Sequence, residues 1–174
     1  MNIKEALEAE HSKTLTLKIL DYIGHDLTRL DELMACFFSE QYRLCQRAAW
    51  AVGYISERNP TLIEPYLERM LLNLQNPTHD AIVRNTMRAF RELPEIPDDI
   101  LGLTADACFR YVQTPSVAIA IRAFSMHVLE KVCRKVPELK EEIALICEDW
   151  LQNEEAPGIR ATAKDVLKKL RQNK

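Results

Sequence analysis

A short turn motif returns along the chain, each time followed by an arginine at a similar distance. The clearest copy is Leu74-Gln75-Asn76-Pro77, with Arg84 downstream. Three further copies follow the same pattern: Val112-Gln113-Thr114-Pro115 with Arg122, Leu151-Gln152-Asn153 with Arg160, and, more weakly, Phe38-Ser39-Glu40 with Arg47. The copies lie roughly 36 to 39 residues apart, which is the period of a two-helix unit in a stacked repeat protein. The spacing therefore predicts an array of similar helical hairpins.

Composition agrees with a helical chain of one-domain size. The sequence has 174 residues, of which 47% are hydrophobic and 28% charged, as in an ordinary globular protein. Its four glycines argue against a β-sandwich or barrel, because such folds need many tight turns. The formal net charge of −3 speaks mildly against a protein built mainly to hold nucleic acid, although a local basic patch remains open.

The cysteines and the chain start bear on compartment and cofactors. The five cysteines stand far apart in the sequence and form no Cys-x-x-Cys pair. We therefore expect each cysteine to be a small buried hydrophobic residue, and we expect no disulfide framework, metal or other cofactor. The acidic first ten residues lack the apolar core of a signal peptide. No window approaches about 18 apolar residues in a row, so no membrane association is expected. These features predict a cytoplasmic protein.

The repeat divides the chain into an N-terminal cap, residues 1–25, and repeats at approximately 26–59, 60–96, 97–136 and 137–174. In the cap, a short amphipathic segment precedes a helix from Ser12 to Gly24. Asp26 is a candidate N-cap of the next helix, and Thr61 is another, with Glu64 completing a capping box. In the third repeat, the predicted buried face consists of Ile100, Leu103, Ala107 and Tyr111.

The pattern Leu-x-Asn-Pro, followed by Val-Arg or Ile-Arg, resembles the HEAT-repeat family and its armadillo-type relatives over roughly residues 26–172. The resemblance implies an all-α fold: a right-handed α-α superhelix of about four HEAT-like hairpins plus a cap, in one domain over residues 1–174. Many HEAT units carry an aspartate six residues before the arginine. Here these positions hold Gln41, Thr78, Ser116 and Glu154, so a regular charge ladder is not expected.

Arg47, Arg84, Arg122 and Arg160 occupy equivalent places near the start of each second helix. The structural interpretation is that each arginine bonds turn carbonyls or the neighbouring repeat while its stem covers apolar surface. The functional alternative is a row of cations on a concave wall, available to an anion or an acidic partner.

One helix face combines arginine with aromatic residues. Arg43, Arg47, Trp50 and Tyr54 follow helical spacing and share a face, and Arg84, Arg88 and Arg91 extend the basic character in the next repeat. This composition is typical of protein-binding hot spots and also of base-stacking surfaces. The alternative is that Trp50 and Tyr54 pack against a neighbouring repeat. These seven residues are the candidate partner-binding site.

Catalytic patterns are lacking in the sequence. His79 beside Asp80 is a weak candidate acid–base pair, and His127 is more simply a half-buried histidine on an apolar helix. The last helix carries a basic run that we interpret as a solvated face: Lys164, Lys168, Lys169, Arg171 and Lys174.

The sequence therefore predicts no enzyme and no catalytic or metal-binding residues. It predicts a scaffold that binds an extended protein or peptide on its concave face, with a HEAT-like DNA-binding or DNA-repair protein as the alternative. It does not predict an oligomeric state.

Overall fold

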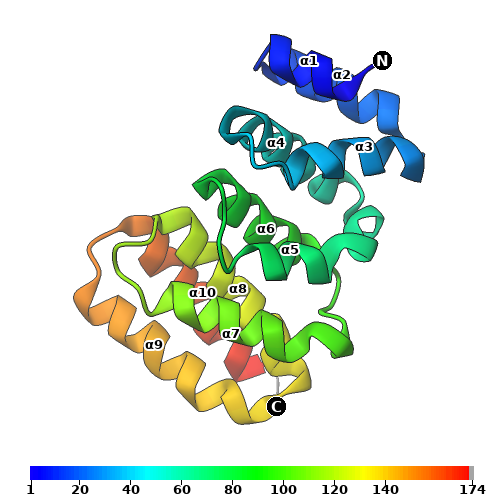
Figure 1. Ribbon diagram of the computed structural model, residues 1–174. Coiled ribbons are helices and arrows are strands. Elements are labelled where there is room, and N and C mark those ends of the chain that lie inside the picture. Colours follow the sequence, from blue (N-terminus) through cyan, green and yellow to red (C-terminus); the bar gives the residue numbers. More distant parts are fainter. Residues whose placement is uncertain (173–174) are drawn as a thin grey trace. The chain divides into compact units, whose positions relative to one another are not determined.

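The computed structural model describes residues 1–172, which form ten α-helices and three short 3-10 helices without any strand (Figure 1). The all-α prediction is confirmed. Lys174, the last residue of the predicted basic run, lies outside the described residues. The chain divides into two compact units, Met1–Leu93 and Pro94–Lys174, which we call the N-terminal and C-terminal units. The single domain and the right-handed superhelix concern the arrangement of these units and stay predictions.

The N-terminal unit begins with the predicted cap. Helix α1 spans Ile3–Ala9 and α2 spans Lys13–Ile23. The Ser12 hydroxyl accepts the Leu15 N–H at 3.0 Å, which satisfies one of the unpaired donors in the first turn of α2. Gly24 ends α2 with a φ of 51°, a left-handed conformation that favours a residue without Cβ. Both predicted ends of this helix are confirmed.

The first predicted repeat forms α3, Leu27–Phe37, and α4, Tyr42–Arg58. Asp26 caps α3 as expected, because one carboxylate oxygen accepts the Thr28 and Arg29 N–H groups at 3.0 and 3.2 Å. The apolar face of α3 is buried, and α3 packs on α4. The helix period in the sequence therefore located this hairpin correctly.

The second predicted repeat differs from the prediction at its start. Residues Pro60–Tyr66 form a 3-10 helix, and α5 spans only Leu67–Asn73, so the capping box of Thr61 with Glu64 is wrong. Pro65 explains the difference, because it has no N–H for the α-helical bond to residue 61. The Thr61 hydroxyl instead donates to Asn59 Oδ1 at 3.0 Å.

Helix α6, Asp80–Glu92, lies against α4 in the N-terminal unit. Gly53 on α4 allows this approach, because a Cβ there would collide with the Asn85 side chain and lie 3.0 Å from Arg88 Nη1. The Asn85 amide is held in place by its own hydrogen bond to the Ala81 carbonyl at 2.9 Å. The glycine thus brings the second helices of two successive repeats into contact.

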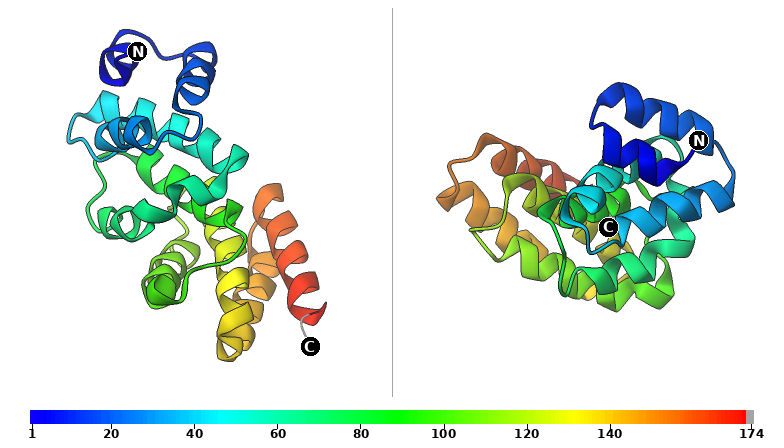
Figure 2. Two further views of the ribbon diagram at one scale, coloured as in Figure 1. Left: turned by 90° about the vertical axis from the view of Figure 1, so that its right-hand side faces the viewer. Right: turned by 45° about the horizontal axis from the view of Figure 1, so that its top comes forward.

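The C-terminal unit contains the two remaining repeats. A 3-10 turn at Asp98–Ile100 leads into α7, Leu101–Val112, and α8 spans Ile119–Lys135. A second such turn at Pro137–Leu139 precedes α9, Lys140–Asn153, and α10, Pro157–Gln172. Helix α8 contacts α7, α9 and α10, while α9 and α10 lie side by side in orange and red (Figure 2). Helix α8 is therefore covered on several sides within its unit.

One predicted core position in α7 is wrong. Leu103 is 40% exposed, and its neighbour Thr104 is fully buried instead. The Thr104 hydroxyl donates to the Ile100 carbonyl at 2.8 Å. Because this bond satisfies the hydroxyl within the helix, threonine enters the core without an unpaired polar group.

Candidate functional site

The arginines at the repeat position have different surroundings. In the N-terminal unit, Arg47 Nη1 donates to the Leu7 and Glu8 carbonyls at 2.5 and 3.0 Å, so it caps the end of α1. In the C-terminal unit, Arg160 Nη1 donates to the Leu151 carbonyl and, at 3.3 Å, to the Glu154 carbonyl. The structural interpretation is therefore confirmed for both arginines.

Arg122 is the most buried of the four, with 4% exposure. Its guanidinium pairs with Glu154 at 2.5 Å and lies 5.0 Å from the centre of the Trp150 ring. Glu154 stands six residues before Arg160, where many HEAT units have an aspartate. Of the four positions that stand six residues before a repeat arginine, this is the only one with a carboxylate in the sequence, and that carboxylate pairs with the arginine of the preceding repeat.

Arg84 is the exception among the repeat arginines. It is exposed on α6, and within residues 1–172 it makes no hydrogen bond, ion pair or ring contact. Arg43, at the start of α4, is likewise exposed and without such a partner in the described part of the chain. These two guanidinium groups are therefore available for an external ligand.

Trp50 and Tyr54 lie on α4 and are half-buried. Their ring centres are 5.9 Å apart at an interplanar angle of 66°, and the His11 ring lies 4.8 Å from Trp50. Both readings of the sequence hold in part, because the rings are packed on one side and accessible on the other. His11 was missed, since it comes from the turn between α1 and α2, far from Trp50 in sequence.

Arg88 and Arg91 are engaged with carboxylates. Arg88 Nε donates to Glu57 Oε1 at 3.1 Å, and its guanidinium lies 5.2 Å from the centre of the Tyr54 ring. Arg91 Nε donates to Glu92 Oε1 at 2.9 Å. The structure thus places the seven predicted residues on two contacting helices, α4 and α6. We call this group the arginine–aromatic surface: Arg43, Arg47, Trp50, Tyr54, Arg84, Arg88 and Arg91.

The two histidines named in the sequence have structural roles. His79 is the N-cap of α6, because its Nδ1 accepts the Ala81 N–H at 2.8 Å, and its ring lies 4.4 Å from that of Tyr42. His127 is half-buried, and its Nδ1 lies 3.7 Å from an Asp165 carboxylate oxygen. Both histidines thus have a contact partner within the fold.

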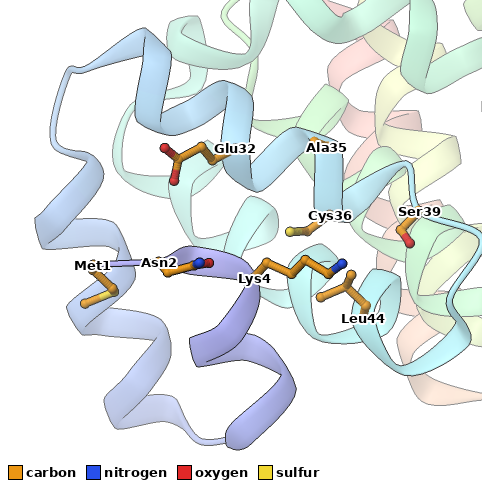
Figure 3. A pocket seen from close by; sticks show the side chains of 8 residues that line it. All are labelled: Met1, Asn2, Lys4, Glu32, Ala35, Cys36, Ser39 and Leu44. Atoms are coloured by element: carbon orange, nitrogen blue, oxygen red, sulfur yellow. The ribbon is translucent and has the colours of Figure 1, made fainter.

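A cavity of about 580 Å³ lies in the N-terminal unit (Figure 3). Its wall includes Lys4 of α1, Glu32 and Cys36 of α3, and Leu44 of α4. Burial raises the pKa of the Cys36 thiol, so little of the nucleophilic thiolate forms at neutral pH. The cavity lining therefore offers no activated nucleophile.

All five cysteines are free and buried. Burial raises the pKa of each thiol, in the case of Cys147 to about 12, as expected for cysteines that act as small hydrophobic residues. Among residues 1–172, no three His, Cys, Asp or Glu side chains are grouped to hold a metal ion. Every helix in the same range is too short or too polar to cross a bilayer.

Comparison with known families agrees with the hairpin architecture. Residues 3–170 match the model of the HEAT repeat domain. The match begins with α1, so it includes the helical pair that the sequence motif left outside the repeats. No curated protein and no solved structure matches the chain. Because the match spans nearly the whole chain, this protein belongs to the HEAT repeat domain family.

Proposed function

We propose that the chain is a non-catalytic scaffold that binds an extended protein partner through the arginine–aromatic surface. HEAT repeats are generally protein-interaction scaffolds, because stacked hairpins present long surfaces without deep pockets. One observation carries the choice of surface. Within residues 1–172, Arg84 alone among the four repeat arginines is exposed without a partner, and its helix α6 packs against α4, which carries Trp50 and Tyr54.

The chemistry of this surface suits protein binding. Tryptophan, tyrosine and arginine are the residues enriched at binding hot spots. Trp50 is held between His11 and Tyr54, and Tyr54 also lies under Arg88. Because these rings are already ordered, a partner loses less conformational entropy in fixing them. The surface thus combines a preorganised aromatic centre with two cations that are unpaired in the described part of the chain.

The non-catalytic part of the proposal rests on what the reactive groups do in the fold. His79 caps a helix, and His127 Nδ1 lies 3.7 Å from an Asp165 carboxylate oxygen. The five reduced, buried thiols fit a reducing compartment, so we also propose the cytoplasm as the location.

The test is affinity capture from a lysate of the source cells with an Arg43→Ala/Arg84→Ala variant. Both side chains are exposed and make no pair with any described residue, so their truncation removes binding groups without unfolding the unit. The matched control is Lys164→Ala/Lys168→Ala, which removes two exposed cations from α10. We expect wild type and control to capture the same partner and the double arginine variant to lose it. If the folded double variant keeps every captured protein, this surface is not the binding site.

A further inference from the structure

Charge is unevenly distributed between the first and second helices of the N-terminal unit. The second helices of its two repeats, α4 and α6, hold six arginines and three carboxylates. The rest of this unit, in residues 1–93, holds five lysines and arginines against ten aspartates and glutamates. The basic groups therefore concentrate on the helices that carry the arginine–aromatic surface.

The C-terminal unit repeats this distribution. Its second helices, α8 and α10, hold nine lysines and arginines against two carboxylates, Glu130 and Asp165. The other residues between 94 and 172 hold two lysines and arginines against eleven carboxylates. The small net charge of −3 thus conceals strongly basic second helices, and it does not argue against an anionic partner.

Most arginines of α4 and α6 are already engaged. Arg47 bonds carbonyl groups, Arg58 pairs with Asp21 at 3.1 Å, and Arg88 and Arg91 bond Glu57 and Glu92. Two exposed arginines remain without a partner within residues 1–172: Arg43 and Arg84. A ligand of this surface thus meets two unpaired cations and one aromatic centre.

We propose that the segment docking here is an acidic stretch of polypeptide that carries an apolar side chain. This inference rests on the proposed function and names its partner class. Carboxylates of the segment bond Arg43 and Arg84, and the apolar side chain covers the accessible sides of Trp50 and Tyr54. Along α4, Arg43 and Trp50 are about 10 Å apart at the helical rise per residue. An extended segment covers that distance in about three residues, which sets the spacing between its acidic and apolar residues.

The number of unpaired cations favours a polypeptide over duplex DNA. A protein that makes about 6–10 phosphate contacts to a duplex needs a comparable number of lysine and arginine side chains. On α4 and α6 that number would require Arg58, Arg88 and Arg91 to leave their carboxylate partners. Two cations on the same pair of helices as an aromatic centre match a short acidic segment instead.

The experiment measures binding of three labelled probes by fluorescence anisotropy. The first is a short acidic peptide with an aspartate three residues before a leucine, and the second is the same peptide with asparagine and glutamine replacing its acidic residues. The third is a duplex DNA of similar length. We expect the acidic peptide to bind about tenfold more tightly than the neutral peptide. Its affinity should fall as salt rises from about 50 mM to about 200 mM. Equal affinity for the two peptides, no binding of the acidic peptide, or tighter binding of the DNA would each overturn the inference.

Variants assign the effect to the surface. Arg43→Gln/Arg84→Gln should lower the affinity for the acidic peptide about fivefold to tenfold and leave the unfolding midpoint unchanged. Lys164→Gln/Lys168→Gln should leave the affinity for this peptide unchanged. If both double variants weaken binding equally, the attraction is not specific to this surface and the inference fails. The two proposals fail separately. If the arginine variant loses its captured protein while the two peptides bind equally, the surface stands and only the acidic partner class is wrong. If the folded arginine variant keeps every captured protein, the proposed function itself is wrong.

Discussion

At the scale of single residues, one repeat position serves different purposes according to what surrounds it. Arg122 meets a carboxylate and an indole ring, whereas Arg47 meets the carbonyl groups that α1 leaves unpaired. Arg84 meets none of these within the described residues. Since a guanidinium group can donate to carboxylates and to carbonyls alike, the neighbour at each site decides whether the arginine stabilises the fold or stays available for binding.

The buried pair of Arg122 and Glu154 gives the first prediction. Glu154→Ala leaves the guanidinium buried without its counter-charge, and we expect the free energy of unfolding to fall by about 2–3 kcal/mol. Glu155→Ala is the control, because that neighbouring glutamate is exposed and makes no such contact in the described chain. Urea unfolding of the two variants measures the difference, and equal midpoints would show that the pair contributes nothing.

A second prediction separates two equivalent arginines. Arg47→Ala removes the donor to the Leu7 and Glu8 carbonyls and should lower the free energy of unfolding by about 1–2 kcal/mol. Arg84→Ala should change it by less than about 0.5 kcal/mol, because that side chain is exposed and unbonded. Thermal unfolding followed by circular dichroism tests this ranking, which an equal loss in both variants would contradict.

At the scale of elements, a single glycine sets how closely α4 and α6 approach. Gly53→Ala forces a methyl group onto the Asn85 amide, and we expect a loss of about 1–3 kcal/mol in the free energy of unfolding. Gly102→Ala on α7 meets nothing within 4 Å and should stabilise its helix by about 0.5–1 kcal/mol. Denaturant unfolding should show a lower free energy of unfolding for Gly53→Ala and a higher one for Gly102→Ala. An unchanged free energy for Gly53→Ala would mean that α4 and α6 can move apart without cost.

The elements also show how far the sequence could predict the structure. The ends of α2 and α3 follow from local chemistry at Ser12, Gly24 and Asp26, which a sequence pattern contains completely. The predicted start of α5 is wrong because Pro65 lacks the N–H that an α-helix capped at Thr61 would need, so the segment forms a 3-10 helix. The contact between His11 and Trp50 could not be predicted, because it joins two distant segments through tertiary packing.

The sequence predicted which residues share the candidate surface. It did not predict which of its arginines have partners within the fold. Helical spacing placed Arg43, Arg47, Trp50 and Tyr54 on one face, since it depends on residue number alone. Spacing could not distinguish the arginines with internal partners from the two without any. That difference depends on Glu57, Glu92 and the end of α1, which come into reach only after folding.

At the scale of the whole molecule, the buried thiols couple folding to pH. Burial raises the pKa of each thiol above its ordinary value of 9.0, so the folded chain holds these protons more tightly than the unfolded chain. Their contribution to stability is therefore complete below about pH 9 and is lost as pH rises through the folded values. We expect the unfolding midpoint to fall above pH 9 and native thiols to react slowly with a colorimetric thiol reagent. Five fast-reacting thiols in the native protein would contradict their burial.

Binding through the arginine–aromatic surface is tested most directly by site-specific photocrosslinking in the source cells. A photoreactive amino acid replaces Asp80, which is exposed on α6 one turn before Arg84, in one sample and the exposed Lys168 on α10 in the other, so that every proposed binding group stays in place. The proposed function predicts a covalent adduct with a protein partner from position 80 and none from position 168. Adducts from position 168 alone, or none from position 80 in a folded variant, would contradict it.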